Sequence, residues 1–293
     1  MSTLQRSIFV SLVGGLLFTQ ALVADETKGS PVSSLSVAQI VDRNIAARGG
    51  LTAWRAVQTL AVTGKVEAGA GDSLTRSRKI ALQGPGASVK RAERAQVAAE
   101  TAKAAAAQVQ LPFRLEKKRT HKSRLELDVG GQTAVQVFDG EHGWKLRPFL
   151  NRNDVEPFTE DEAKSESAEA EVDGPLVDYA AKGTQVALEG TEPVDGRNAY
   201  KLKLTLKSGD VRHIWIDAQS FLDVKVQGSP RRLDGKMHDV FVYQRDFRAV
   251  HGLMVPFEYV TAVEGFPGTH GMFVESVTVN TALDDARFTK PRA

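Results

Sequence analysis

Residues 124–129 read Arg-Leu-Glu-Leu-Asp-Val, and this stretch decides the fold class because apolar and charged side chains alternate in it without a break. Residues 200–207, Tyr-Lys-Leu-Lys-Leu-Thr-Leu-Lys, repeat the pattern. Successive side chains of a β-strand point to opposite faces of its sheet, so each stretch presents one wet face and one buried face. Both stretches therefore predict strands that cover a core on one side only.

Short segments of the same kind continue before and after these two stretches. Glycine-containing turns such as Gly130-Gly131 and Asp195-Gly196 separate them, and the short spacings predict antiparallel pairing of neighbours. About a dozen strands are too many for a flat sheet, because strand twist makes a long sheet curl. The sequence thus predicts a mainly β fold of the α+β class, with one large curved antiparallel sheet and a concave face. The further predicted strands are 60–67, 75–83, 113–119, 133–139, 211–217, 222–227, 237–247, 253–263 and 272–280.

The first of a few predicted helices has clear start and stop signals. Ser36 is a good N-cap, and Gln39, three positions later, completes a capping box. The Gly49-Gly50 pair ends this helix, because glycine tolerates the left-handed conformation at a helix C-terminus. Residues 51–57, which include Trp54, add one more helical turn.

Three further helical segments are predicted in the chain. A capping box at Thr159 and Glu162 begins a strongly acidic helix, and residues 173–179 begin a short, more apolar one. The alanine-rich segment 87–110 consists of strong helix formers without a wide apolar face. It is either a solvated helical excursion or a mobile lid over a pocket. The acidic run within 154–173 is either a solvated face or a docking surface for a basic partner.

The N-terminal residues have the pattern of an export signal. Arg6 is the only charge in residues 1–24, an apolar run follows it, and small residues end the run. A membrane-spanning helix is the alternative, but Gly14-Gly15, Thr19 and Gln20 interrupt the apolar run. We expect a signal peptide at 1–24, a flexible lead-in at 25–35 and a single domain at 36–293 with a helical insertion at about 87–110.

The composition excludes several function classes. The 293 residues include 38 basic and 36 acidic side chains, and the formal net charge of +2 is too small for bulk attraction to nucleic acid or a membrane surface. Cysteine is absent, which excludes disulfides, thiolate metal sites, cysteine nucleophiles and a lipid-modified N-terminal cysteine. With 42% hydrophobic and 25% charged residues, the sequence is that of an ordinary folded protein.

No residue pattern predicts catalysis or metal binding. The six histidines have none of the H-x-x-x-H, H-x-H or H-E-x-x-H spacings of metal sites, and a G-x-S-x-G motif is absent. The basic cluster 117–122 either binds a phosphate or lipid headgroup or forms a solvated hairpin end. We therefore expect no catalytic residue, no metal and no cofactor. An enzyme would require His142 or His213 to meet carboxylates in a pocket.

Alternation also indicates which side chains line the concave face. If the helices only cover this face, an apolar cavity remains for a hydrophobic ligand, and if they fill it, the same side chains form a plain core. Trp215 is ambiguous, because Ile214 and Ile216 flank it. The predicted apolar ligand-binding residues are Leu125, Leu127, Tyr200, Leu202, Leu204, Val255, Phe257 and Phe273, with Trp144 near the rim.

Five motifs follow one another in a characteristic order. They are 44–51 (Asn-Ile-Ala-Ala-Arg-Gly-Gly-Leu) with Trp54, 60–66 (Leu-Ala-Val-Thr-Gly-Lys-Val), 137–144 (Val-Phe-Asp-Gly-Glu-His-Gly-Trp), 173–179 (Asp-Gly-Pro-Leu-Val-Asp-Tyr) and 251–257 (His-Gly-Leu-Met-Val-Pro-Phe). Over most of residues 36–290 this order resembles the outer-membrane lipoprotein-sorting-protein-like family of bacterial envelope proteins, related to the LolA/LolB carriers. The alanine-rich segment departs from the pattern of the family as an insertion.

The resemblance implies an incomplete antiparallel β-barrel, helices that cover an apolar cavity, and a periplasmic location in Gram-negative bacteria. In the best understood relatives the cavity takes lipoprotein acyl chains. We therefore expect a periplasmic, non-enzymatic binding or carrier protein for a lipid, a lipoprotein acyl chain or another apolar ligand. The alternative is an envelope-stress sensor or regulator that acts through a protein partner. No nucleic-acid partner and no integral membrane segment after signal cleavage are expected.

Overall fold

The computed structural model describes residues 35–68 and 109–292. The chain divides into two units, residues 1–34 and 35–293, and every described residue belongs to the second unit. The predicted signal peptide, the lead-in up to residue 34, the predicted strand 75–83 and the insertion up to residue 108 lie outside the described residues.

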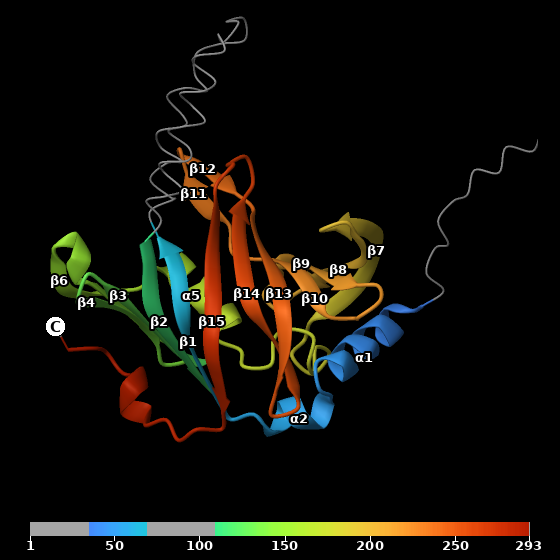
Figure 1. The fold of residues 1–293 in the computed structure, drawn as a ribbon, viewed down its shortest axis with the longest axis horizontal. Coiled ribbons are helices and arrows are strands. Elements are labelled where there is room, and N and C mark those ends of the chain that lie inside the picture. Colours follow the sequence, from blue (N-terminus) through green and yellow to red (C-terminus); the bar gives the residue numbers. More distant parts are fainter. Residues whose placement is uncertain (1–34, 69–108, 293) are drawn as a thin grey trace, which may run out of the picture. The chain divides into compact units, whose positions relative to one another are not determined.

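One antiparallel sheet of thirteen strands dominates the described structure (Figure 1). Its strands are β1 (Thr59–Ala68), β2 (Val109–Lys118), β3 (Lys122–Val129), β4 (Gln132–Phe138), β5 (Gly143–Arg147), β6 (Arg152–Pro157), β7 (Gln185–Val194), β8 (Arg197–Thr205), β9 (Val211–Asp217), β10 (Asp223–Gln227), β13 (Val240–Val250), β14 (Leu253–Val263) and β15 (Thr269–Val279). Their order is β6-β5-β4-β3-β2-β1-β15-β14-β13-β10-β9-β8-β7, and the sheet does not close into a barrel. The predicted large antiparallel sheet of an incomplete barrel is confirmed.

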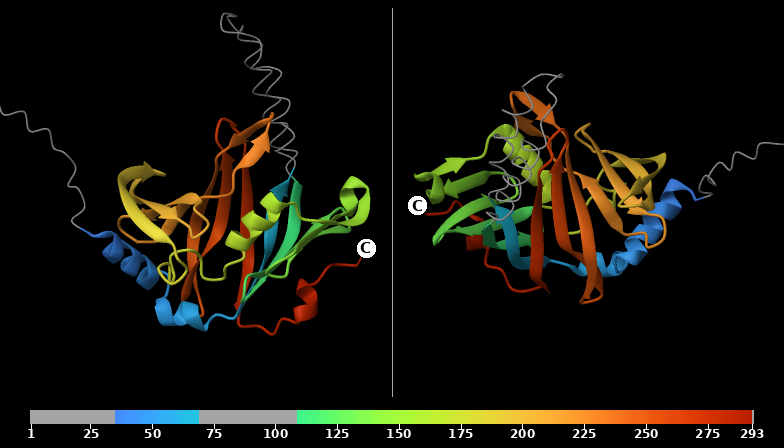
Figure 2. Two further views of the ribbon diagram at one scale, coloured as in Figure 1. Left: turned by 180° about the vertical axis from the view of Figure 1, so that it is seen from behind. Right: turned by 45° about the horizontal axis from the view of Figure 1, so that its top comes forward.

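The strand order places a long connection across the sheet. The first and last strands of the chain, β1 and β15, pair with each other in the interior of the sheet. In contrast, β6 and β7 follow one another in the sequence but form the two opposite edges. Residues 158–184 must therefore pass from one edge to the other, and the helix that they contain lies over one face of the sheet (Figure 2).

A separate two-stranded hairpin interrupts the run of long strands. It consists of β11 (Arg231–Leu233) and β12 (Lys236–His238). The prediction of one continuous strand over 237–247 is wrong, because β12 ends at His238 and β13 begins after Asp239. The long strand thus splits between the hairpin and the main sheet.

The N-terminal helices form where the sequence predicts them. In α1 (Val37–Ala47), the Ser36 side chain accepts a hydrogen bond from the Gln39 amide, and the Gln39 side chain caps the Ser36 amide in return. A short helix, α2 (Leu51–Ala56), follows the Gly49-Gly50 turn. Gly49 has φ +115°, and a Cβ there would lie 2.4 Å from the carbonyl oxygen of Gly252. Only glycine fits this turn, which presses α1 and α2 against the start of β14.

One of the two predicted helices between β6 and β7 is absent. The acidic helix, α5 (Glu160–Glu169), has the predicted capping box at Thr159 and Glu162. Residues 173–179, predicted to begin a helix, instead form bends and turns. Gly174 and Asp178 adopt positive φ angles of +77° and +53°, which right-handed helix does not allow. Two short 3₁₀ turns, η1 (Pro148–Leu150) and η2 (Asp285–Phe288), complete the elements.

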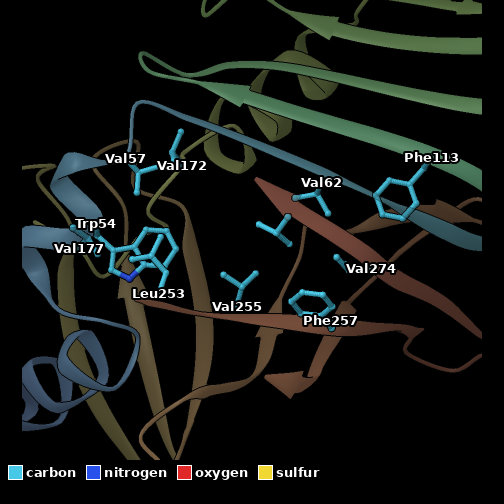
Figure 3. Packing of buried hydrophobic residues seen from close by; sticks show 11 residues of the cluster. Trp54, Val57, Val62, Phe113, Val172, Val177, Leu253, Val255, Phe257 and Val274 are labelled. Carbon is cyan, nitrogen blue, oxygen red and sulfur yellow. The ribbon is translucent and has the colours of Figure 1, made fainter. Parts of the chain in front are cut away.

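Two apolar clusters form the core on the concave face. The first packs α2 and the 172–177 turns against β1, β2, β14 and β15, and Trp54 lies beside Leu253 in it (Figure 3). The second packs α1 and Leu176 against β8 and β9. Among the described residues, no helix has the length and apolar character needed to cross a membrane.

Candidate functional site

The concave face carries an apolar floor over β2 and β3. Leu125 and Leu127 lie cross-strand from Leu115 and Phe113. Phe113 is buried, whereas both leucines of β3 are half-buried and pack against the first core cluster. The structure therefore places the two predicted residues of β3 on the inner face, with part of their surface still accessible.

The floor continues over β14 and β15. Val255 and Phe257 are buried in the first cluster, as expected for inward residues. Two positions further along β14, Tyr259 lies cross-strand from Met272, and both pack partly buried against the same cluster. Burial raises the pKa of Tyr259 to about 12, although the nearby charge of Arg48 opposes this.

The predicted residues of β8 belong to a filled part of the interior. Tyr200, Leu202 and Leu204 are 8%, 0% and 1% exposed. They pack in one cluster with Ile40 and Val41 of α1, so this helix fills the space above them. These three side chains form a plain core in the described structure, and the accessible apolar surface lies over β2, β3, β14 and β15.

Phe273 does not face inward, and the prediction that it does is wrong. Thr63 pairs with Ser276 but Gly64 pairs with Val274, so one residue of β15 is extra and the alternation changes phase there. Val274 therefore enters the core, while Phe273 lies cross-strand from Glu258 on the opposite face. The strand pattern alone does not reveal such a bulge.

Trp144 also lies on the face opposite to the one predicted. It is the cross-strand neighbour of Val137, whereas the next residue, Lys145, pairs with Gln136 on the concave side. Since Gln136 pairs with Leu125, the inner face of β5 presents Lys145 and not Trp144. The predicted rim position of the tryptophan is thus incorrect.

The ambiguous Trp215 belongs to the convex face. It packs in a third cluster with Val194 and Ala199, and partly buried Phe241 lies against it. The Lys225 ammonium lies 4.1 Å from the Trp215 ring centre, and burial lowers the pKa of this lysine. A cation between aromatic rings accounts for the burial of Trp215 without a ligand.

Helix α5 crosses the concave face, and polar contacts hold its first side to β3 and β5. Lys145 Nζ donates to Glu162 Oε1 at 2.5 Å, and Ser123 Oγ donates to Glu166 Oε1 at 2.5 Å. No residue of the helix itself is buried. This attachment therefore differs from that of α1, which buries Ile40 and Val41.

The other side of α5 reaches the opposite half of the sheet. Lys164 Nζ donates to Asp210 Oδ1 at 2.9 Å in the turn between β8 and β9. Ser229, which follows β10, donates through Oγ to Glu169 Oε1 at 3.2 Å. Side-chain contacts of α5 with both halves thus make it a polar strap over an apolar face. At least three of its carboxylates are engaged by the chain itself, which weakens their interpretation as a docking surface.

Lys117 fastens the C-terminal end of the strap from below. It lies two positions after Leu115 in β2 and therefore on the same face of the sheet, where it points toward α5. Its Nζ donates closely to the carbonyl oxygen of Glu169 and, at 3.4 Å, to that of Glu171. Burial lowers the pKa of Lys117, although the carboxylates of Glu166, Glu169 and Glu171 oppose this. A cation at the end of a helix satisfies carbonyls that lack partners within the helix.

Glu166 is the titratable group of the strap that faces the floor. Burial raises the pKa of its carboxyl above the ordinary value, and the hydrogen bond from Ser123 only partly offsets this. The carboxylate is therefore held partly out of water at an energetic cost. Its ionisation opposes the docking of α5.

The basic side chains of the predicted cluster 117–122 are engaged in ion pairs and hydrogen bonds with the chain itself. Lys118 and Lys122 lie 3.1 and 2.8 Å from Asp285, in the segment that covers the convex face. Arg119 Nη2 lies 2.8 Å from Asp173. A pocket of about 170 Å³ lies beside them, lined by Arg119, Thr120, His121, Glu171, Val172, Asp173 and Lys182. Because its cations already pair with its carboxylates, this pocket has little spare charge for a phosphate.

A second pocket of about 220 Å³ lies between α2 and the start of β14. It is lined by Ala53, Ala56, Val57, His251, Leu253, Val279 and Asn280. The histidines named as potential catalytic groups line neither pocket. His213 lies 3.1 Å from Glu189 and His142 lies 3.9 Å from Asp139. Within residues 35–68 and 109–292, no group of three acidic or histidine side chains is placed to hold a metal ion.

Two polar side chains at the contact between the strap and the sheet, Lys117 and Glu166, were not predicted from the sequence. Lys117 lies on the same face of β2 as Leu115 and Phe113. A lysine at a position where alternation predicts an apolar side chain could have indicated its special role. For Glu166 no signal existed, because the helix is polar all round. Its contact with Ser123 depends on the path of the whole connection across the sheet.

No protein-family model and no curated protein matches the chain. A LolA superfamily protein from Nitrosomonas europaea superposes with a TM-score of 0.51 at 13% identity, over 88% of this chain and 99% of that one. The chain has a LolA-like fold. A putative outer membrane lipoprotein-sorting protein domain from Vibrio parahaemolyticus (TM-score 0.50, 11% identity, 86% of this chain and 95% of that one) is also similar. So is a DUF1329 family protein from Desulfovibrio piger (0.51, 12%, 86% and 97%). The family resemblance of the sequence is thereby confirmed at the level of the LolA-like fold.

Proposed function

We propose that this protein is a periplasmic, non-enzymatic binding or carrier protein for a lipid, a lipoprotein acyl chain or another apolar ligand. One observation carries the proposal. An accessible apolar floor, which includes Leu125, Leu127 and Met272, lies under a helix that buries none of its own residues. A helix with an apolar face would seal such a floor permanently, whereas polar contacts can exchange with water when the helix lifts.

The energetics favour an apolar ligand under the strap. Each methylene group that leaves water contributes about 0.8 kcal/mol, so a long acyl chain gains more than the few polar contacts of α5 cost. When α5 lifts, hydrogen bonds to water replace its hydrogen bonds with Lys145, Ser123 and Lys117. Apolar burial is therefore the term that would drive uptake.

Native mass spectrometry of the purified protein, followed by extraction and analysis of bound lipids, tests the proposal. Met272 and Phe273 are adjacent in β15 but face opposite sides of the sheet, so they provide a matched pair of variants. We expect bound lipid in the wild type and in Phe273→Asn, and a loss of it in Met272→Asn. Circular dichroism confirms that both variants are folded. Wild-type protein free of apolar ligand, and unable to take up a fluorescent fatty acid, would refute the proposal.

The periplasmic location rests on residues 1–24 and is tested separately. Expression of the full chain in a Gram-negative host, osmotic release of the periplasm and N-terminal sequencing should locate the mature protein and its first residue. Recovery in the cytoplasm with residues 1–24 intact would contradict export. Action as an envelope-stress regulator through a protein partner stays a prediction, because no contact in the described structure favours it.

A further inference from the structure

The hairpin of β11 and β12 presents positive charge that no carboxylate among the described residues compensates. Arg231, Arg232 and Lys236 are all exposed. Within the described residues none of the three forms an ion pair, and the Arg232 guanidinium donates only to the carbonyl oxygen of Gly235. The carboxylate of Asp234 is engaged by His238 at 2.9 Å. The low net charge of the chain therefore conceals a local excess of cations.

An exposed apolar side chain lies among these cations. Met237 is 55% exposed and pairs cross-strand with Arg232, so the two side chains share one face of the hairpin. The adjacent residues Arg231 and Lys236 are also exposed, and alternation places them on the opposite face of the hairpin. An exposed apolar side chain on a hairpin that carries exposed cations on both of its faces matches the interface of an anionic lipid bilayer, where phosphates meet acyl chains.

The base of the hairpin is tied to the main sheet. The Gly228 amide donates to the carbonyl oxygen of Val240 at 2.9 Å, and the Glu264 amide donates to that of Asp239 at 2.8 Å. The rings of His238 and Phe266 pack edge to face with centres 5.0 Å apart. The hairpin is therefore anchored where it leaves β10 and where it joins β13, and its cations are presented on a defined element (Figure 1).

We propose that the β11–β12 hairpin docks the protein on the surface of an anionic lipid bilayer. Arg231, Arg232 and Lys236 contact the lipid phosphates, and Met237 inserts between the headgroups. This surface is distinct from the apolar floor, so the proposal does not depend on the proposed ligand binding. A carrier with such a hairpin would load or release its ligand beside a membrane.

Binding to vesicles tests the proposal directly. Each basic side chain near an anionic surface strengthens binding about fivefold, so the triple variant Arg231→Ala/Arg232→Ala/Lys236→Ala should bind about 100-fold more weakly. The measurement is co-sedimentation with vesicles of phosphatidylcholine and phosphatidylglycerol in equal amounts, and with vesicles of phosphatidylcholine alone. The matched control Lys207→Ala/Lys290→Ala/Arg292→Ala removes the same charge from exposed positions elsewhere and should bind as the wild type. Binding by wild type should fall with added salt, because salt screens exposed charges.

A fluorescent probe locates the contact. Since the chain has no cysteine, Met237→Cys and Ser276→Cys each give a single site for an environment-sensitive label. Fluorescence should rise on anionic vesicles for the label at position 237 and stay constant for the label at 276. Equal binding of the wild type and the hairpin triple variant, or equal responses at both positions, would overturn the proposal. The proposal would also be overturned if the wild type bound vesicles equally with and without phosphatidylglycerol, or bound an acidic protein but no vesicle. None of these outcomes affects the lipid content of the purified protein, which tests the ligand proposal.

Discussion

Replacement of Lys117 by methionine should release α5 from the sheet. Methionine preserves the apolar stem of the side chain but removes the ammonium group that donates to the carbonyl oxygens of Glu169 and Glu171. The two carbonyls lie just beyond or at the end of α5, where no amide of the helix can replace the lost donor. The variant should therefore weaken the strap while the floor beneath it stays intact.

The magnitude follows from one close and one long hydrogen bond. A charged donor contributes about 1.5 to 3 kcal/mol when its bond is close, and the contact at 3.4 Å adds little. Loss of this partly desolvated charge returns part of the energy, since burial already lowers the pKa of the half-buried Lys117. We expect a net loss of about 2 kcal/mol in the docking of α5, which is a factor of about 30 in its opening equilibrium.

Amide hydrogen exchange measures this opening element by element. The amides of Ala163 and Ala170, which bond within and at the end of α5, should exchange about 30-fold faster in Lys117→Met than in the wild type. Amides of α1 should exchange at unchanged rates, because its apolar face packs independently of the strap. Uptake of a fluorescent fatty acid should accelerate in the same variant.

Lys118 provides the matched control. It is adjacent in β2 but faces the convex side, where its Nζ donates to the carbonyl oxygen of Leu283 at 2.8 Å. Lys118→Met should speed exchange near η2 and leave α5 unchanged. Equal exchange of α5 in the wild type and Lys117→Met would refute the role of Lys117 in holding the strap. Faster exchange of α5 in both variants would show general destabilisation instead.

Three further predictions concern the strap and the sheet that supports it. Because burial raises the folded-state pKa of Glu166, the docking of α5 should become weaker as pH rises through that pKa. Exchange of α5 amides, corrected for intrinsic rates, should therefore speed up with pH in the wild type. In Glu166→Gln the corrected exchange should not change with pH. Although burial opposes it, the Arg197 guanidinium lowers the pKa of Asp217 to about 2, so Asp217→Asn should cost about 2 kcal/mol in urea unfolding at neutral pH. That difference should vanish as pH falls from 3.8 toward about 2, and a constant difference would contradict the assignment. Gly64→Ala would place a Cβ 2.0 Å from the carbonyl oxygen of Phe273 and should lower stability by about 2 kcal/mol, whereas an unchanged melting temperature would show that the sheet relaxes there.

Local patterns predicted the elements well because their causes are local. The capping boxes at Ser36 and Thr159 start α1 and α5 as expected, since each side chain bonds an amide three residues away. Alternation predicted that Leu125 and Leu127 face inward, because pleating is a property of the strand itself. The prediction failed for Phe273, where a bulge in the pairing with β1 changes the phase of the alternation. It also failed for Trp144, because β5 turns the adjacent Lys145 toward the concave face. There Lys145 bonds to Glu162 of α5, a contact that the strand pattern does not reveal.

The functional interpretation of single residues depended on what covers them. Tyr200 and Leu125 are equivalent in sequence pattern, yet α1 fills the space above the first, whereas the second stays half-buried at the edge of the first core cluster. The charges of residues 117–122 read as a free basic cluster, but Asp285 and Asp173 neutralise them from distant parts of the chain. Conversely, the low net charge of the sequence gives no sign of the cations of the β11–β12 hairpin, and none of them forms an ion pair within residues 35–68 and 109–292.

Local residue patterns are enough to specify a mainly antiparallel sheet with one apolar face, two well-capped helices and the absence of any cysteine chemistry. Periodicity and capping encode these features within a few residues, so no knowledge of the partner strands is required. Local patterns do not reveal that β1 pairs with β15 in the interior of the sheet while β6 and β7 become its edges. That strand order forces residues 158–184 across the concave face and brings Lys117 and Ser123 under α5. The candidate site arises from pairings between segments distant in sequence, which local patterns do not encode.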